Sequence, residues 1–115
     1  MADETIYKRD EKGRRIAKKL KTRVARVRFR NHSVNINRTI SIGRDEGNDI
    51  VIRDDPLVSR RHALIEKEGE FYYVMDKGST NGTYLNNNPI PRLERVKIKG
   101  GDVLTVGKTK LYFTF

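Results

Sequence analysis

From Thr22 onward, apolar and polar residues alternate in short runs. Ala25, Val27 and Phe29 alternate with arginines, which predicts a strand with one buried face. The two-residue period continues over 34–42, and more short apolar runs follow. We expect these later strands at 50–52, 63–65, 71–75, 83–85, 96–98, 103–106 and 111–115. Short strands with turn signals roughly every eight to twelve residues indicate a β-sandwich or barrel.

Turn-forming residues separate the expected strands. We expect turns at Asn31-His32, at Asp54-Asp55-Pro56 and at 86–89, and a longer polar loop over 76–82. After residue 22 the sequence has no stretch that keeps a helical period for three turns. The fold class predicted is therefore all-β.

The composition bounds the chain to one small domain. It has 115 residues, of which 36% are hydrophobic and 35% charged, and it contains no cysteine, so disulfides and thiolate metal sites are excluded. No apolar run approaches the roughly 20 residues of a membrane helix. The sequence opens without an apolar secretion signal. We therefore expect a soluble cytoplasmic protein with no membrane partner.

The positive charge is concentrated at the N-terminus. Residues 1–30 hold twelve Lys/Arg against four Asp/Glu, a net charge of +8, whereas residues 31–115 hold thirteen against eleven, a net charge of +2. This predicts a basic, largely flexible arm over 1–21 and a domain over 22–115. The arm could bind nucleic acid through residues 8–30, an anionic membrane or an acidic protein, or only keep the chain soluble. Nucleic acid is not favoured, because no aromatic residue interleaves the charges from Lys8 to Arg28 along the sequence.

Polar residues cluster in three segments where expected strands end. The segments are 43–44, 59–62 and 78–83. If their loops share one end of the sandwich, they present guanidinium, hydroxyl and amide donors together, which is the set that a tetrahedral dianion requires. No metal site is indicated, because only His32 and His62 are available and the carboxylates are scattered. No cofactor is indicated either.

In this order and at these separations, the three segments resemble the forkhead-associated (FHA) domain. The resemblance covers about residues 22–115 and implies an eleven-stranded β-sandwich of the SMAD/FHA type whose loops bind phosphothreonine peptides. It implies that Arg44 and Ser59 contact the phosphate, that Thr80 supplies another hydroxyl, and that Asn81 holds the peptide backbone. The residues that it implies for shaping the loops are Gly43, His62 and Gly82. The implied partners are proteins phosphorylated by a Ser/Thr kinase.

Two residues set this chain apart within the resemblance. Arg60 stands where many family members have asparagine after the motif serine, and it either adds a second cation near the phosphate or points to solvent. Leu57 lies where the family tends to read the third residue after the phosphothreonine. An apolar side chain there cannot pair with an acidic peptide residue, so we expect an aliphatic preference at that peptide position.

Two other interpretations concern catalysis and regulation. Ser59 and His62 could be a nucleophile and its base, but Ser59 is not on a Gly-x-Ser-x-Gly turn, so we expect no enzyme and a structural role for His62.

Thr5 follows two acidic residues, and the seventeen residue-to-residue steps from Thr5 to Thr22 could span about 55 Å when extended. Phosphorylated Thr5 could then enter the domain's own pocket as an autoinhibitory switch. The alternative is an unmodified arm residue.

Overall fold

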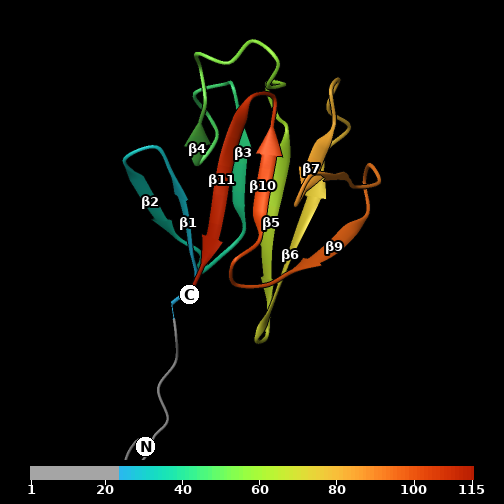
Figure 1. The fold of residues 1–115 in the computed structure, drawn as a ribbon. Coiled ribbons are helices and arrows are strands. Elements are labelled where there is room, and N and C mark those ends of the chain that lie inside the picture. Colours follow the sequence, from blue (N-terminus) through green and yellow to red (C-terminus); the bar gives the residue numbers. More distant parts are fainter. Residues whose placement is uncertain (1–23) are drawn as a thin grey trace, which may run out of the picture.

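The computed structural model describes residues 24–115 as two β-sheets packed face to face (Figure 1). These residues form eleven strands and contain no helix. The all-β sandwich of about eleven strands expected from the sequence is thereby confirmed.

The first sheet has six strands in the order β2-β1-β11-β10-β7-β8. Its paired strands are antiparallel. In chain order the strands are β1 (Arg26–Phe29), β2 (His32–Asn35), β7 (Thr83–Leu85), β8 (Asn88–Pro89), β10 (Val103–Val106) and β11 (Thr109–Thr114).

The second sheet has five strands in the order β4-β3-β5-β6-β9. The β3–β4 pair is parallel, and the other pairs are antiparallel. In chain order the strands are β3 (Ile40–Gly43), β4 (Ile50–Val51), β5 (Ala63–Glu68), β6 (Phe71–Asp76) and β9 (Arg95–Ile98).

The core lies between the two sheets and is built from the inward-facing positions of each strand. Apolar side chains from both sheets are almost completely buried, and Phe113 of β11 is the largest of those that are fully buried. Its ring lies 5.2 Å from that of Tyr72 on the opposite sheet and 5.6 Å from that of Phe115, measured between centroids. Burying a side chain of this size contributes about 2–3 kcal/mol, so these contacts hold the two sheets together.

The strand register brings the loops that carry the polar segments to one end of the sandwich. Ala63 at the start of β5 pairs with Ile42 near the end of β3 and with Asp76 at the end of β6. Thr83 at the start of β7 pairs with Val106, next to the β10–β11 turn. This end is uppermost in Figure 1, and the C-terminus and the start of β1 lie toward the opposite end.

The structure differs from the sequence prediction at two hairpins. Asn88–Pro89 was expected within a turn but forms β8, because Asn86 and Asn87 adopt positive φ angles of 51° and 72° and complete the turn by themselves. His32 was also expected in a turn, but it begins β2 and pairs with Phe29. The predicted arm over 1–21 and its Thr5 lie outside the described residues, so the domain boundary at 22 stays a prediction.

Candidate functional site

Gly43 closes β3 at a point where no side chain fits. A Cβ atom at this position would lie 2.1 Å from the carbonyl oxygen of Arg60. That carbonyl accepts hydrogen bonds from Asn48 Nδ2 (2.8 Å) and from the Asp45 N–H (3.3 Å). The close approach therefore binds the β3–β4 loop to the β4–β5 loop through backbone groups.

Arg44 follows directly and turns its guanidinium toward the β4–β5 loop. Its N–H donates to the Ser59 carbonyl (3.0 Å), and its Nε donates to the Val58 carbonyl (2.9 Å). Within residues 24–115 its two Nη groups have no hydrogen-bond partner. Among residues 24–115 the side chain is thus held in place by one nitrogen, and no group of that segment takes up its remaining donors, which suit an anion.

Asp55 anchors the β4–β5 loop to the opposite sheet. Its carboxylate is buried and accepts hydrogen bonds from the Leu57 N–H (3.1 Å), the Lys108 N–H (2.7 Å) and the Thr109 hydroxyl (2.8 Å). Burial alone would raise the pKa of Asp55, but these hydrogen bonds outweigh it and hold the pKa below its usual value. From the sequence, Asp55 was expected only as part of a turn.

His62 is a fully buried structural residue. The Ser59 N–H donates to its Nδ1 (3.0 Å), and its Nε2 lies 2.8 Å from the Gly82 carbonyl. Because Nδ1 accepts a hydrogen bond, the ring proton is on Nε2 and is donated to Gly82. One imidazole therefore joins the β4–β5 loop to the β6–β7 loop.

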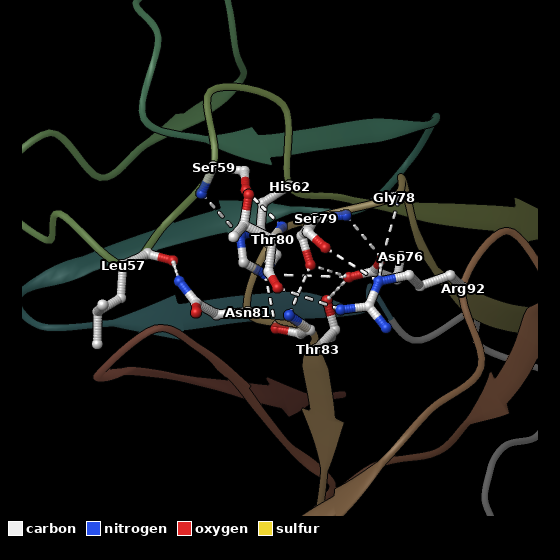
Figure 2. Close-up of polar contacts among 11 residues, drawn as sticks. Leu57, Ser59, His62, Asp76, Gly78, Ser79, Thr80, Asn81, Thr83 and Arg92 are labelled. Atoms are coloured by element: carbon white, nitrogen blue, oxygen red, sulfur yellow. Dashed lines mark hydrogen bonds and ion pairs between the residues drawn. The ribbon is translucent and has the colours of Figure 1, made fainter.

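The β6–β7 loop is organised around Asp76, which Figure 2 shows at the centre of several contacts. This fully buried carboxylate accepts hydrogen bonds from the N–H groups of Gly78 and Ser79 (both 2.9 Å) and from the hydroxyls of Ser79 and Thr83 (both 2.6 Å). Burial raises the pKa of Asp76, but the four hydrogen bonds outweigh that effect and lower it overall. Its position at a strand end before a turn-rich loop was the only sequence signal for it.

Arg92 holds the same loop from outside. Its Nε donates to the Ser79 carbonyl (3.0 Å) and lies 3.9 Å from Asp76 Oδ2, and its Nη2 donates to the Thr80 carbonyl (3.3 Å). This residue follows β8, and nothing in the local sequence marks it as part of the loop. Its contact with the loop was therefore not predicted from the sequence.

Two cross-loop hydrogen bonds bring the predicted binding residues together (Figure 2). The Thr80 N–H donates to Ser59 Oγ (3.0 Å), and Asn81 Nδ2 donates to the Leu57 carbonyl (3.0 Å). Since Ser59 Oγ accepts here, its own proton is available to another acceptor. Thr80 and Asn81 are exposed, and so is Arg60, which makes no side-chain hydrogen bond or ion pair within residues 24–115. Leu57 is also exposed.

The assembled site is a set of hydrogen-bond donors at one end of the sandwich. The guanidinium of Arg44 and the hydroxyls of Ser59 and Thr80 come from three loops that hydrogen bonds hold together. Such donors on a preorganised frame suit a phosphate group. Residues 24–115 contain no cluster of side chains able to hold a metal ion. In the same residues no helix is long and apolar enough to cross a membrane.

The geometry does not arrange Ser59 and His62 as a nucleophile and its base. His62 Nδ1 accepts from the backbone N–H of Ser59, while the Ser59 hydroxyl accepts from Thr80. Both imidazole nitrogens are already engaged with backbone groups. General-base activation requires the base to receive the hydroxyl proton, and this contact is lacking.

Comparison with known proteins gives one consistent family. The FHA domain model matches residues 40–107, more than half of the chain. The glycogen accumulation regulator GarA of Mycolicibacterium smegmatis is 43% identical over 75 residues, which cover 65% of this chain and 45% of the relative. The oxoglutarate dehydrogenase inhibitor of Corynebacterium jeikeium is 41% identical over 75 residues, 65% of this chain and 49% of the relative. The chain spans about half the length of these curated relatives.

Solved structures share the fold over most of the chain. The FHA domain of an Arabidopsis thaliana hypothetical protein has a TM-score of 0.73 and 31% identity, covering 80% of this chain and 85% of that one. An FHA domain solved in a study of phosphothreonine-dependent interactions has a TM-score of 0.73 and 25% identity, covering 81% and 97%. Mycobacterium tuberculosis EmbR, solved with a low-affinity phosphopeptide, has a TM-score of 0.72 and 29% identity, covering 79% and 24%.

Proposed function

The chain belongs to the FHA domain family, and from that premise we propose that it docks proteins that carry phosphothreonine. One observation carries the proposal: the hydrogen bond from the Thr80 N–H to Ser59 Oγ joins two loops of donors beside Arg44, whose Nε is held by the Val58 carbonyl. A preformed donor set of this kind can bind a phosphate without first ordering its loops.

Each predicted residue has a role in this proposal. Arg44 pairs its Nη groups with phosphate oxygens, while the hydroxyls of Ser59 and Thr80 donate to others. Asn81 holds the peptide backbone next to the phosphothreonine, and its bond to the Leu57 carbonyl orients the amide for that contact. The exposed Arg60 adds a second cation at the rim.

The phosphate supplies the affinity. Each charge-assisted hydrogen bond contributes about 1.5–3 kcal/mol, so losing two or three of them weakens binding roughly a hundredfold or more. An unphosphorylated threonine offers none of these bonds. We also expect threonine to be preferred over serine, through contact with the γ-methyl group.

Leu57 selects the peptide residue three positions after the phosphothreonine. The residue is 39% exposed, so its apolar surface is open to contact with a ligand, and its backbone is fixed by Asp55 and Asn81. We predict an aliphatic preference at that peptide position. A degenerate phosphopeptide library read by sequencing checks it, and a strong preference for aspartate there would be incompatible with the assignment.

The proposed binding of phosphothreonine also indicates the cellular role of the chain. The matched relatives are named as a regulator and an inhibitor, and phosphothreonine requires a Ser/Thr kinase upstream. We therefore place the chain in a kinase-dependent signalling interaction in the cytoplasm. We propose that it acts by binding alone and catalyses no reaction. The contacts of His62 with backbone groups support this view.

Selection from peptide libraries tests the proposal. Three immobilised libraries share their flanking residues and differ only in a central phosphothreonine, phosphoserine or unmodified threonine. We expect the full chain to be retained by the phosphothreonine library, weakly by phosphoserine and not by threonine. Equal retention on the phosphothreonine and threonine libraries would refute phosphate-dependent docking.

A further inference from the structure

The outer face of the six-stranded sheet carries cations without carboxylates. Arg26 and Arg28 of β1 and Lys110 of β11 point to solvent, and in the described chain none of this sheet's six strands contains aspartate or glutamate. Arg95 on the other sheet, by contrast, pairs with Glu68 (2.6 Å) and Glu66 (3.7 Å). The strands of the other sheet carry three cations and three carboxylates in all, so among the strands the net positive charge lies on the six-stranded sheet.

The same face also carries aromatic rings between the cations. The register pairs Arg28 with Tyr112, and the guanidinium carbon lies 5.3 Å from the ring centroid. Thr105 pairs with Lys110 on one side and with Tyr84 on the other. We call Arg26, Arg28, Tyr84, Lys110 and Tyr112 the basic sheet face. The sequence has no aromatic residue between Lys8 and Arg28, but strand pairing places Tyr112 beside Arg28 from a distant segment.

Within residues 24–115 the cations of this face are not neutralised. Arg26 donates to the neutral side chain of Asn35 (3.2 Å), and neither Arg26, Arg28 nor Lys110 pairs with a carboxylate of that segment. Arg30, just beyond β1, does pair with Asp54 (2.9 Å). Unpaired like charges on neighbouring strands repel one another, so an anionic ligand would relieve that repulsion.

The chain that precedes this face continues the charge. Residues 1–23 contain nine Lys/Arg and four Asp/Glu and lead directly into β1. The basic sheet face and this segment are therefore adjacent in sequence, and both attract polyanions.

We propose that the basic sheet face binds single-stranded nucleic acid. Arg26, Arg28 and Lys110 contact backbone phosphates, and bases stack on Tyr112 and Tyr84, each of which is 38% exposed. The aromatic rings favour unpaired bases over a duplex, whose stacked bases cannot reach them. A membrane fits less well, because the exposed large apolar side chains of these six strands are the two tyrosines alone, with no aliphatic residue to enter a bilayer. The inference is independent of the phosphothreonine proposal.

Fluorescence anisotropy of the full chain with a labelled deoxythymidine oligomer of about 20 nucleotides tests this inference. Three variants are compared with wild type: the triple charge variant Arg26→Gln/Arg28→Gln/Lys110→Gln, the ring variant Tyr112→Thr, and the control Arg95→Gln/Lys97→Gln on the other sheet. Each lost phosphate contact reduces the steepness of the plot of log association constant against log salt concentration by roughly 0.7. We therefore expect the triple variant to reduce that steepness by about 2. The ring variant should weaken binding about fivefold to a hundredfold. The control should keep most of the affinity, with a smaller loss of slope than the triple variant.

The possible outcomes separate the ligands and the surfaces. Wild-type affinity and slope in both sheet-face variants would assign the binding to residues 1–23 and overturn the proposal. Equal affinity for a duplex of the same length, no binding of the oligomer, or binding only to vesicles containing phosphatidylserine would also overturn it. Phosphothreonine-peptide affinity and thermal unfolding of each variant report on the fold. Because the substituted side chains are exposed, both should stay near wild type, and the single variant Tyr112→Thr keeps the test decisive if the triple variant unfolds.

Discussion

Asp76 shows how one buried side chain organises the site. A carboxylate without solvent is costly unless its lone pairs are satisfied, and here four donors from Gly78, Ser79 and Thr83 surround it. These bonds fix the course of the loop that presents Thr80 and Asn81. The carboxylate therefore positions two residues of the proposed binding surface although it is itself buried beneath that surface.

The lowered pKa of Asp76 makes this contribution dependent on pH. The pKa of an aspartate in the unfolded chain is about 3.9, and that of the folded Asp76 is lower. The contribution of Asp76 to the free energy of unfolding should therefore be complete above about pH 5 and should be lost as the pH falls below about 3.9 toward the folded pKa. At pH 7, Asp76→Asn replaces one acceptor by an amide that faces N–H donors, and we expect a loss of about 2–4 kcal/mol in the free energy of unfolding. Urea unfolding at several pH values from 3 to 7 measures both effects.

The matched control for Asp76 is an exposed aspartate. Asp54 pairs only with Arg30 among residues 24–115, so Asp54→Asn should change stability by no more than about 0.5 kcal/mol. If Asp76→Asn were as stable as this control, or kept the full acid sensitivity of wild type, the role assigned to Asp76 would be wrong.

At the scale of strands and loops, Gly43 determines how closely two loops approach. The Arg60 carbonyl occupies the space of a Cβ atom, so Gly43→Ala must push the backbone of one loop away. We expect it to destabilise the domain by about 1–3 kcal/mol and to weaken phosphopeptide binding by displacing Arg44. Gly47→Ala is the control, because its Cβ would meet only the end of the Arg61 side chain at 3.9 Å. Urea unfolding that gave equal stabilities for the two variants would contradict this account.

The strands could be predicted from sequence because their signal is local. Alternation of apolar residues with arginines marks β1, a continuous apolar run marks β6, and the polar segments at strand ends mark the loops of the site. The contacts of Asp55 and Arg92 could not be predicted, because they join residues 53 and 13 positions apart that only the tertiary fold brings together. The short strand β8 was missed because Asn86 and Asn87 alone complete its turn, which leaves two residues for pairing.

At the scale of the whole molecule, the two proposed surfaces lie on different parts of the sandwich. The phosphothreonine loops occupy the end formed by the β3–β4, β4–β5 and β6–β7 connections, whereas the basic sheet face covers strands of the six-stranded sheet. Residues 24–115 hold sixteen Lys/Arg and eleven Asp/Glu, a net charge of +5, and three of these cations lie on one sheet face whose strands contain no carboxylate. A phosphorylated protein and a nucleic acid strand could thus be held at the same time.

The measurement that tests the central claim most directly is calorimetric titration of a selected phosphothreonine peptide against wild type, Arg44→Ala and Arg95→Ala. Arg95 is a matched control, because it is an arginine on the outer face of β9 that pairs with Glu68. We expect binding to need both the phosphate and Arg44, with Arg44→Ala roughly a hundredfold weaker and Arg95→Ala close to wild type. Wild type and Arg44→Ala binding the phosphopeptide with equal affinity would show that the loops described here are not the phosphate site.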